Sequence, residues 1–233
     1  MLCSITTFSQ DIKYGVKGGL NLSNLKGDYP NLSDEDVKLD TKSSIGFHIG
    51  GFLEYKINDK FSIQPELLIS MQGNKLELTS EFYDSFYDEN YKETFTQTPK
   101  LYYLNIPLML KYKLIDKLSI EFGPQIGILL SAKSKWEYKD YNDPSENGSI
   151  NVDLLNDGTY NFLGENIQVK KGMKRFDFGL NIGASYDITE KFFLQGRYNL
   201  GLATIDENST VGDEYKSWNL KNSVFQLSAG YRF

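Results

Sequence analysis

One short pattern occurs three times in this chain and constrains its fold more than any other feature. In each copy a Tyr, an Ile or Leu, an acidic residue and a Lys are followed by alternating apolar residues, at positions 54–64, 111–121 and 185–195. The acid and the Lys suit the tip of a solvated turn, and the period of two places every second side chain on one face of a strand. Each copy therefore predicts a tight β-hairpin.

Longer segments separate the three copies, so short turns alternate with long connections. The same alternation of apolar and polar residues predicts eight strands, at residues 12–22, 44–57, 61–71, 102–114, 118–130, 176–188, 192–202 and 225–233. We expect polar, aromatic residues 73–100 to be a long connection, although their aromatic residues could equally extend the flanking strands. Residues 149–169 could add a hairpin beyond the main sheet.

Composition sets the outer bounds of the fold. No Pro/Gly/Ser-rich linker divides the 233 residues, so we interpret 11–233 as one domain. No apolar run is long enough for a transmembrane helix, and the mean hydropathy is -0.42. A barrel strand hides its lipid face in every second residue, so a membrane barrel is compatible with this value. The net charge of -6 argues against nucleic acid as a partner.

Residues 1–10 differ from the rest of the chain. Their apolar residues and the small Ser9 resemble the end of a secretory signal, without the basic segment that normally begins one. We expect either a residual signal-peptide segment, cleaved after Ser9 or Gln10, or a disordered tail. Cleavage there would remove Cys3, the only cysteine.

Strand alternation alone does not say which face of the barrel is inside. A soluble lipocalin-type barrel would turn its apolar face inward. The alternation of short and long connections, the aromatic residues near the ends of the apolar rows and the glycine-rich polar faces favour the inverse arrangement. We therefore predict an all-β protein: an eight-stranded, antiparallel, up-and-down transmembrane β-barrel with short periplasmic turns and long extracellular loops.

Several segments are similar to a known family. The segments are Tyr14 to Asn21, Tyr103 to Tyr112, Gly123 to Gly127 and Gly230 to Phe233. They resemble the PorT-like outer-membrane β-barrel family of Bacteroidetes, and the resemblance spans nearly the whole chain. It implies an outer-membrane location and a small barrel of the OmpA or OmpX type. It implies little about activity, although the family's namesake is tied to protein secretion.

The polar faces carry the charges that an eight-stranded barrel must accommodate inside. Such a barrel leaves room for side chains and hardly for a column of water. An isolated buried ion is costly, so we expect a lumen charge network in which Glu66 and Glu121 pair with Arg197 and Lys111. Arg197 suits the centre, because its planar guanidinium can bridge two carboxylates.

The last strand ends in a row of alternating residues that we expect to face lipid. The row consists of Phe225, Leu227, Ala229, Tyr231 and Phe233. A terminal aromatic residue in such a row resembles the recognition strand of outer-membrane barrels. We therefore expect this row to act as an assembly signal, with outer-membrane lipid and the barrel-assembly machinery as partners.

Nothing in the sequence predicts a catalytic, cofactor or metal site. The single histidine, His48, lies mid-strand on a polar face, where a hydrogen-bonded lumen residue is the favoured interpretation over a catalytic one. The acidic clusters at 34–36 and 84–89 lack regular ligand spacing for calcium. The aromatic residues of the connection, which could form a contact surface, are Phe82, Tyr83, Phe86, Tyr87 and Tyr91.

These observations favour a monomeric, non-enzymatic outer-membrane barrel. We expect an envelope-structural or interaction role through the extracellular loops, with an unidentified extracellular or envelope protein as partner and a possible link to protein secretion. The alternatives are an outer-membrane barrel enzyme and a soluble, lipocalin-like ligand-binding barrel.

Overall fold

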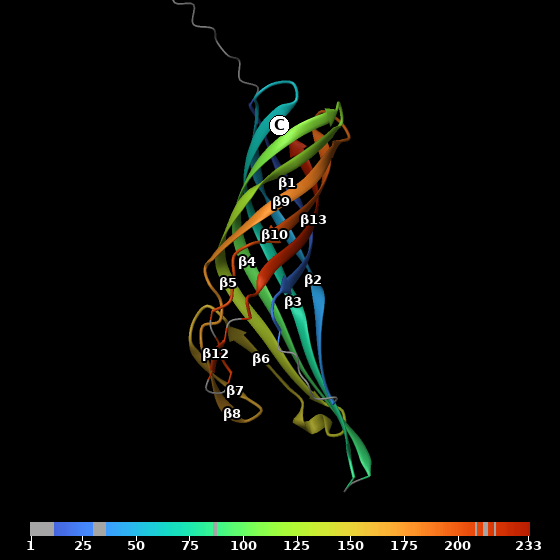
Figure 1. Ribbon diagram of the computed structural model, residues 1–233, viewed down its shortest axis with the longest axis vertical. Coiled ribbons are helices and arrows are strands. Elements are labelled where there is room, and N and C mark those ends of the chain that lie inside the picture. Colours follow the sequence, from blue (N-terminus) through green and yellow to red (C-terminus); the bar gives the residue numbers. More distant parts are fainter. Residues whose placement is uncertain (1–11, 30–35, 86–87, 208, 212–213, 217) are drawn as a thin grey trace, which may run out of the picture.

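Eight long strands form a closed ring (Figure 1). The computed structural model describes residues 12–29, 36–85, 88–207, 209–211, 214–216 and 218–233. The ring strands are β1 (Ile12–Lys26), β2 (Val37–Lys56), β3 (Phe61–Asp84), β4 (Glu89–Ile115), β5 (Leu118–Asp140), β9 (Phe176–Asp187), β10 (Phe192–Gly201) and β13 (Lys221–Arg232). Each pairs antiparallel with the next, and β1 closes the ring against β13. Closure leaves none of the eight as a free edge, and the predicted fold class is confirmed.

The apolar faces of the strands point outward. On β4, Leu108 is 49 % exposed on the outer surface, whereas its neighbour Met109 is completely buried in the barrel. The outer rows of β1, β2, β5, β9, β10 and β13 are likewise exposed and apolar, while Asn, Gln, Ser and charged side chains fill the interior. This inversion of the usual soluble pattern confirms the predicted face assignment and contradicts the lipocalin-type alternative.

The connections at the two ends of the barrel differ in length. The short turns 57–60, 116–117 and 188–191 lie at one end, together with the start of β1 and the C-terminus (Figure 1). The other end carries the longer connections. We refer to them as the short-turn end and the long-loop end.

Residues 73–100 form strands instead of the loop that we expected. β3 and β4 remain paired as far as Asp84 and Glu89, and this hairpin projects well beyond the ring (Figure 1). Phe82 and Tyr91 stack across it with ring centroids 5.6 Å apart. Cross-strand aromatic pairs of this kind stabilise a hairpin. The aromatic residues of 73–100 therefore extend the flanking strands, the alternative that the sequence had left open.

Shorter elements cover the long-loop end. They are the 3-10 helix η1 (Pro144–Glu146), β6 (Gly148–Asp153), β7 (Gly158–Phe162), β8 (Glu165–Val169), β11 (Ser209–Val211) and β12 (Glu214–Lys216). β6 pairs with the outer part of β5, whereas β7 and β8 form the extra hairpin that we expected within 149–169. Leu163 and Gly164 both have positive φ at its two-residue turn, as a turn of type I′ requires.

Some predictions fall on residues that the structure does not describe. The proposed signal segment 1–10, most of the acidic cluster 34–36, and Phe86 and Tyr87 lie outside the described residues. Within the described residues no helix has the length and apolar character needed to cross a membrane.

Candidate functional site

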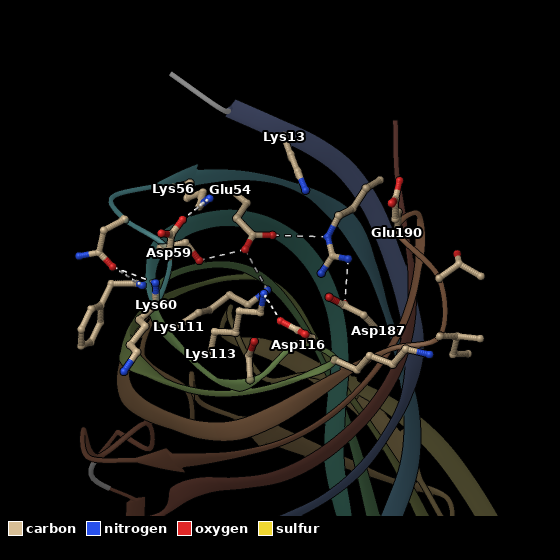
Figure 2. Close-up of a pocket in the computed structure, with 18 residues that line it drawn as sticks. Lys13, Glu54, Lys56, Asp59, Lys60, Lys111, Lys113, Asp116, Asp187 and Glu190 are labelled. Atoms are coloured by element: carbon tan, nitrogen blue, oxygen red, sulfur yellow. Dashed lines mark hydrogen bonds and ion pairs between the residues drawn. The ribbon is translucent and has the colours of Figure 1, made fainter. Parts of the chain in front are cut away.

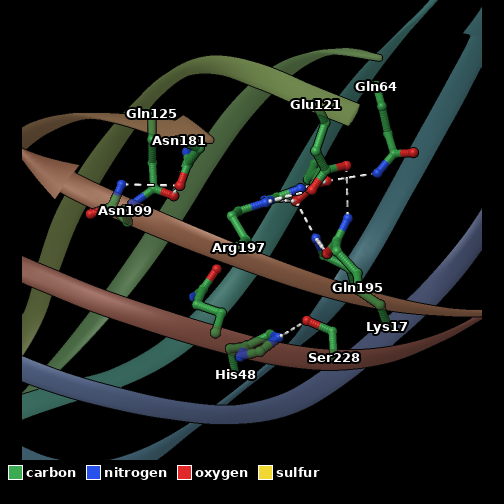
Figure 3. Close-up of polar contacts among 12 residues, drawn as sticks. Lys17, His48, Gln64, Glu121, Gln125, Asn181, Gln195, Arg197, Asn199 and Ser228 are labelled. Atoms are coloured by element: carbon green, nitrogen blue, oxygen red, sulfur yellow. Dashed lines mark hydrogen bonds and ion pairs between the residues drawn. The ribbon is translucent and has the colours of Figure 1, made fainter. Parts of the chain in front are cut away.

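A charge network occupies the middle of the lumen (Figure 3). Arg197 on β10 donates two hydrogen bonds to Glu66 on β3, at 2.9 and 2.8 Å, and one to Glu121 on β5 at 3.1 Å. Lys17 on β1 lies 2.7 Å from the same Glu66 and donates to Gln195, which donates in turn to Glu121. Two cations therefore balance two carboxylates, and every one of these side chains is buried.

One residue of the expected network lies elsewhere. Lys111 does not pair with Glu66 or Glu121, although it lies opposite Glu121 in the β4–β5 ladder. Its ammonium group turns toward the short-turn end, 3.3 Å from Glu54, and donates to Gln64. The physical reason is that Arg197 and Lys17 already neutralise the two central carboxylates. Glu54, near the short-turn end, would have Arg232 as its only cationic partner if Lys111 turned inward.

The sequence analysis missed the second cation of the network. The alternation of the first strand puts Lys17 on its polar face, but no feature of one strand shows that it reaches Glu66 on β3. The ring order supplies that information, because β2 alone separates β1 from β3.

Two aromatic rings fill the lumen near the short-turn end. Phe52 on β2 and Phe193 on β10 meet edge to face with centroids 5.6 Å apart, and both are buried. The guanidinium of Arg232 stacks on Phe193 at 4.5 Å. Glycine makes room for both rings: a Cβ at Gly15 would lie 2.5 Å from Phe52, and one at Gly230 would lie 2.1 Å from Phe193.

The only histidine has the contacts of a catalytic base without access to a substrate. His48 Nδ1 lies 2.7 Å from Asn21 Oδ1, and Nε2 lies 2.7 Å from Ser228 Oγ (Figure 3). Asn21 Oδ1 can only accept, so Nδ1 carries the proton and Ser228 donates to Nε2. All three residues are buried, and none lines either of the two cavities described below. The burial of all three fits the hydrogen-bonded lumen residue that the sequence favoured for His48.

The first cavity opens at the short-turn end and measures about 820 Å³ (Figure 2). Glu54 lies at its centre, between Lys111 and Arg232, and Asp187 accepts a 2.8 Å hydrogen bond from Arg232. Lys13 also points into this mouth (Figure 2). Most of the charges are matched within the chain, so this cavity is a solvated vestibule above the aromatic pair.

The second cavity, of about 810 Å³, lies at the long-loop end. Three of its lining residues, Leu25, Met173 and Leu220, belong to a buried apolar cluster. The other members of this cluster are Leu101, Tyr103, Leu129, Ala132, Leu155 and Ile205. Trp218 and Tyr29 pack against this cluster. Their two rings meet each other edge to face, with centroids 5.8 Å apart. Burial raises the pKa of Tyr29 to about 12, so its hydroxyl stays protonated and donates to the Leu25 carbonyl oxygen.

Two polar groups in this cavity wall lack a partner in the described structure. The Ser134 hydroxyl and the Trp136 indole N–H are buried without a hydrogen bond, and Ser134 is only 1 % exposed. Both residues are on β5 and face inward because a β-bulge near Leu130 shifts the alternation of that strand. Buried polar groups normally have a hydrogen-bond partner. Two neighbouring groups without one, in the wall of an apolar cavity, therefore indicate a place for a ligand atom.

The proposed assembly residues lie on the outer surface of β13. Phe225, Leu227 and the terminal Phe233 are exposed, with Ala229 and Tyr231 between them in the same row. Phe233 stacks on Tyr14 of β1 at 5.4 Å, so the C-terminus lies at the seam that closes the ring. Their part in assembly stays a prediction.

Within the described residues, no group of three or more His, Cys, Asp or Glu side chains could hold a metal ion.

Together these features define a membrane β-barrel with a filled lumen, a vestibule at one end and an apolar cavity at the other. Residues 8–207 match the outer membrane protein beta-barrel domain. The chain belongs to this family and is an outer-membrane protein.

Solved structures to which the chain is similar include the attachment invasion locus protein Ail of Yersinia pestis, with 14 % identity, a TM-score of 0.42 and coverage of 95 % of this chain and 98 % of Ail. Neisserial surface protein A is 12 % identical, with a TM-score of 0.44 and coverage of 94 % and 97 %. The Escherichia coli outer membrane protease OmpT is 11 % identical, with a TM-score of 0.33 and coverage of 98 % and 99 %. No curated protein matches the chain.

Proposed function

We propose that this protein is a closed, non-enzymatic outer-membrane barrel that binds a ligand at its extracellular end. Outer-membrane barrels keep short turns on the periplasmic side and longer loops outside, so the long-loop end faces the exterior. The observation that carries the proposal is the second cavity, with the unpartnered Ser134 and Trp136 in its apolar wall.

The chemistry of the wall defines the class of ligand. The cavity has the size of a typical small-molecule site and is lined mainly by aliphatic and aromatic side chains. The Trp136 N–H can only donate, and the Ser134 hydroxyl can donate as well. The ligand is therefore an apolar molecule, or an apolar part of a larger partner, that carries one acceptor oxygen.

The filled lumen supports binding over transport. The charge network and the Phe52–Phe193 pair leave the middle of the barrel occupied by side chains. Purified protein should accordingly show no stable, large single-channel conductance in a planar bilayer, and such a conductance would contradict the closed barrel.

The two tryptophans of the chain provide a direct test of the cavity. Trp136 and Trp218 both line it, so intrinsic fluorescence reports on its contents. Protein in nanodiscs is titrated with ethyl 6-bromohexanoate, whose bromine quenches indole and whose carbonyl accepts hydrogen bonds. Saturable quenching is expected, with 1-bromohexane, which lacks an acceptor, binding more weakly.

Variants separate the cavity from partitioning into lipid. Ser134→Ala should weaken ester binding about three- to tenfold, since one hydrogen bond is lost, and should leave bromohexane unaffected. Ser43→Ala, at an exposed serine outside the cavity, is the matched control. Linear quenching that is equal for both probes and all variants would reject the site.

The resemblance to the PorT-like family extends the proposal to a link with protein secretion, through an envelope protein that binds the extracellular loops. Comparing the secreted proteins of a deletion strain with those of a strain carrying Ser134→Ala tests this link. An unchanged secretome in the deletion strain would remove it and leave the ligand site untouched.

A further inference from the structure

Three lysines that line the vestibule at the short-turn end lack an acidic partner. They are Lys13 near the start of β1, Lys60 in the turn before β3 and Lys117 in the turn before β5. In the part of the chain that the structure describes, their ammonium groups form no ion pair and no hydrogen bond. All three side chains are exposed, so a ligand that enters the vestibule can reach them.

Most of the other charges in the vestibule pair with one another. The pairs are Lys56–Asp59, Lys113–Asp116, Lys111–Glu54, Arg232–Glu54 and Arg232–Asp187. Among the described acidic residues that line the cavity, only Glu190 forms no ion pair. Three unpaired cations therefore face one unpaired carboxylate, and the vestibule keeps an excess of positive charge although the chain has a net charge of -6.

A buried cation in the same wall has unused hydrogen-bonding capacity. Arg232 is only 6 % exposed, and its Nη1 donates a hydrogen bond to Asp187. Its Nε is buried and makes no hydrogen bond in the described structure, although it lies 3.4 Å from a carboxylate oxygen of Glu54. Buried polar groups normally have a hydrogen-bond partner. This arginine therefore indicates, independently of the lysines, that the vestibule can take an acceptor from outside the chain.

The positions of the three lysines around the ring limit what that acceptor can be. β2 separates Lys13 from Lys60, and β4 separates Lys60 from Lys117. Each lysine is thus two strand spacings, roughly 10 Å, from the next along the rim. The two oxygens of a single carboxylate cannot reach cations so far apart. Alternate residues of an extended peptide place acidic side chains on one face roughly 7 Å apart, a spacing that flexible lysine side chains can bridge.

We propose that the vestibule binds a short, extended, acidic segment of a periplasmic protein. The short-turn end of an outer-membrane barrel faces the periplasm. The cavity of about 820 Å³ has the volume of a small-ligand site, so only a few residues of the segment enter it. Phe52 and Phe193 close the lumen beneath, so the segment is held at the mouth and does not pass through. This site is independent of the cavity at the long-loop end.

A synthetic peptide is the probe for this proposal. It is a heptapeptide with aspartate at its second, fourth and sixth positions and serine elsewhere, with both ends blocked and an uncharged dye attached. Binding to the protein in nanodiscs of neutral phosphatidylcholine, which exclude anionic lipid, is followed by fluorescence anisotropy. Saturable binding is expected, and added salt should weaken it, because salt screens exposed charges.

Two control peptides test the chemistry and the spacing. The first has asparagine in place of every aspartate and should not bind measurably. The second keeps only the central aspartate. An exposed ion pair strengthens binding roughly two- to fivefold, so the peptide with three aspartates should bind roughly four- to twenty-five-fold more tightly than the peptide with one.

A pair of matched triple variants locates the site. Replacing Lys13, Lys60 and Lys117 by Gln should weaken binding of the three-aspartate peptide roughly ten- to a hundredfold, from three ion pairs at two- to fivefold each. The control replaces Lys100, Lys139 and Lys221, three exposed lysines outside both cavities, by Gln. It removes the same charge and should change binding less than about twofold.

Three results would overturn the proposal. Equal losses in the two triple variants would mean that net charge alone attracts the peptide. Equal binding of the aspartate and asparagine peptides would mean that carboxylates are not recognised. Equal binding of the peptides with three aspartates and with one would mean that the vestibule takes a single anion and not an extended segment. All six substituted lysines are exposed, and heat-modifiable migration on a gel confirms that each variant is folded.

Discussion

Arg197 and Glu66 meet across the barrel interior through two parallel hydrogen bonds of 2.9 and 2.8 Å. Their strands, β10 and β3, are not neighbours in the ring, and β13, β1 and β2 lie between them. The pair therefore ties opposite walls of the barrel. The planar guanidinium and the carboxylate match in shape, and this bidentate geometry is strong and specific.

Replacing this arginine should be strongly destabilising. Arg197→Met strands two buried carboxylates beside a single Lys17, and we expect a loss of about 3–5 kcal/mol in the free energy of unfolding. Urea titration of protein folded in liposomes measures it. Adding Glu121→Gln to Arg197→Met leaves Lys17 and Glu66 as a balanced pair, so the double variant should lose less than the single one. A double variant as unstable as the sum of its parts would show that the charges are not coupled.

The sequence predicted the ring and its faces because both follow from local patterns. Alternation of period two decides which side chains share a face, and three repeated turns decide which strands pair as hairpins. Arg197 and Glu66 could be assigned to the lumen for the same reason. The contact of Lys17 with Glu66, however, depends on the order of strands around the ring and on the direction in which each long side chain turns. The sequence of a single strand predicts neither.

The sequence analysis also missed the bulge in β5 and did not establish the extension of the β3–β4 hairpin. The bulge near Leu130 shifts the alternation of β5 and brings Ser134 and Trp136 inside, so strict alternation fails there. The polar composition of 73–100 suggested a loop, yet Phe82 and Tyr91 stack across paired strands. The cavity itself arises from distant loops and has no signature in any one segment.

The outer surface should respond to charge according to depth in the membrane. Leu108 lies in the middle of the outer row of β4, and Leu108→Arg should cost about 2–4 kcal/mol if it lies near the bilayer midplane. Leu114 is on the same row and equally exposed, but lies next to a short turn. Leu114→Arg should cost at most about 1 kcal/mol, as expected near an interface. Equal costs in liposome unfolding would contradict this placement.

The aromatic pair in the lumen depends on glycine at the contact. Gly230→Ala would put a Cβ 2.1 Å from the Phe193 ring, and overpacking of this kind should destabilise by about 1–3 kcal/mol. Gly196→Ala is the control, because a Cβ there meets no atom within 4 Å. Adding Phe193→Leu to Gly230→Ala should recover part of the loss. Equal unfolding free energies for the two glycine variants would refute the packing argument.

The C-terminal residue should affect insertion more than stability. Phe233 is exposed at the end of the outer row of β13 and stacks on Tyr14 at the seam of the ring. If this row is the assembly signal, deletion of Phe233 should lower the yield of folded, heat-modifiable protein in the outer membrane. Phe176→Ala, at an equally exposed aromatic residue on β9, should leave that yield unchanged. Because both changes remove one lipid-facing ring, similar yields for the two variants would show that lipid contact, and not recognition of the last strand, accounts for any loss.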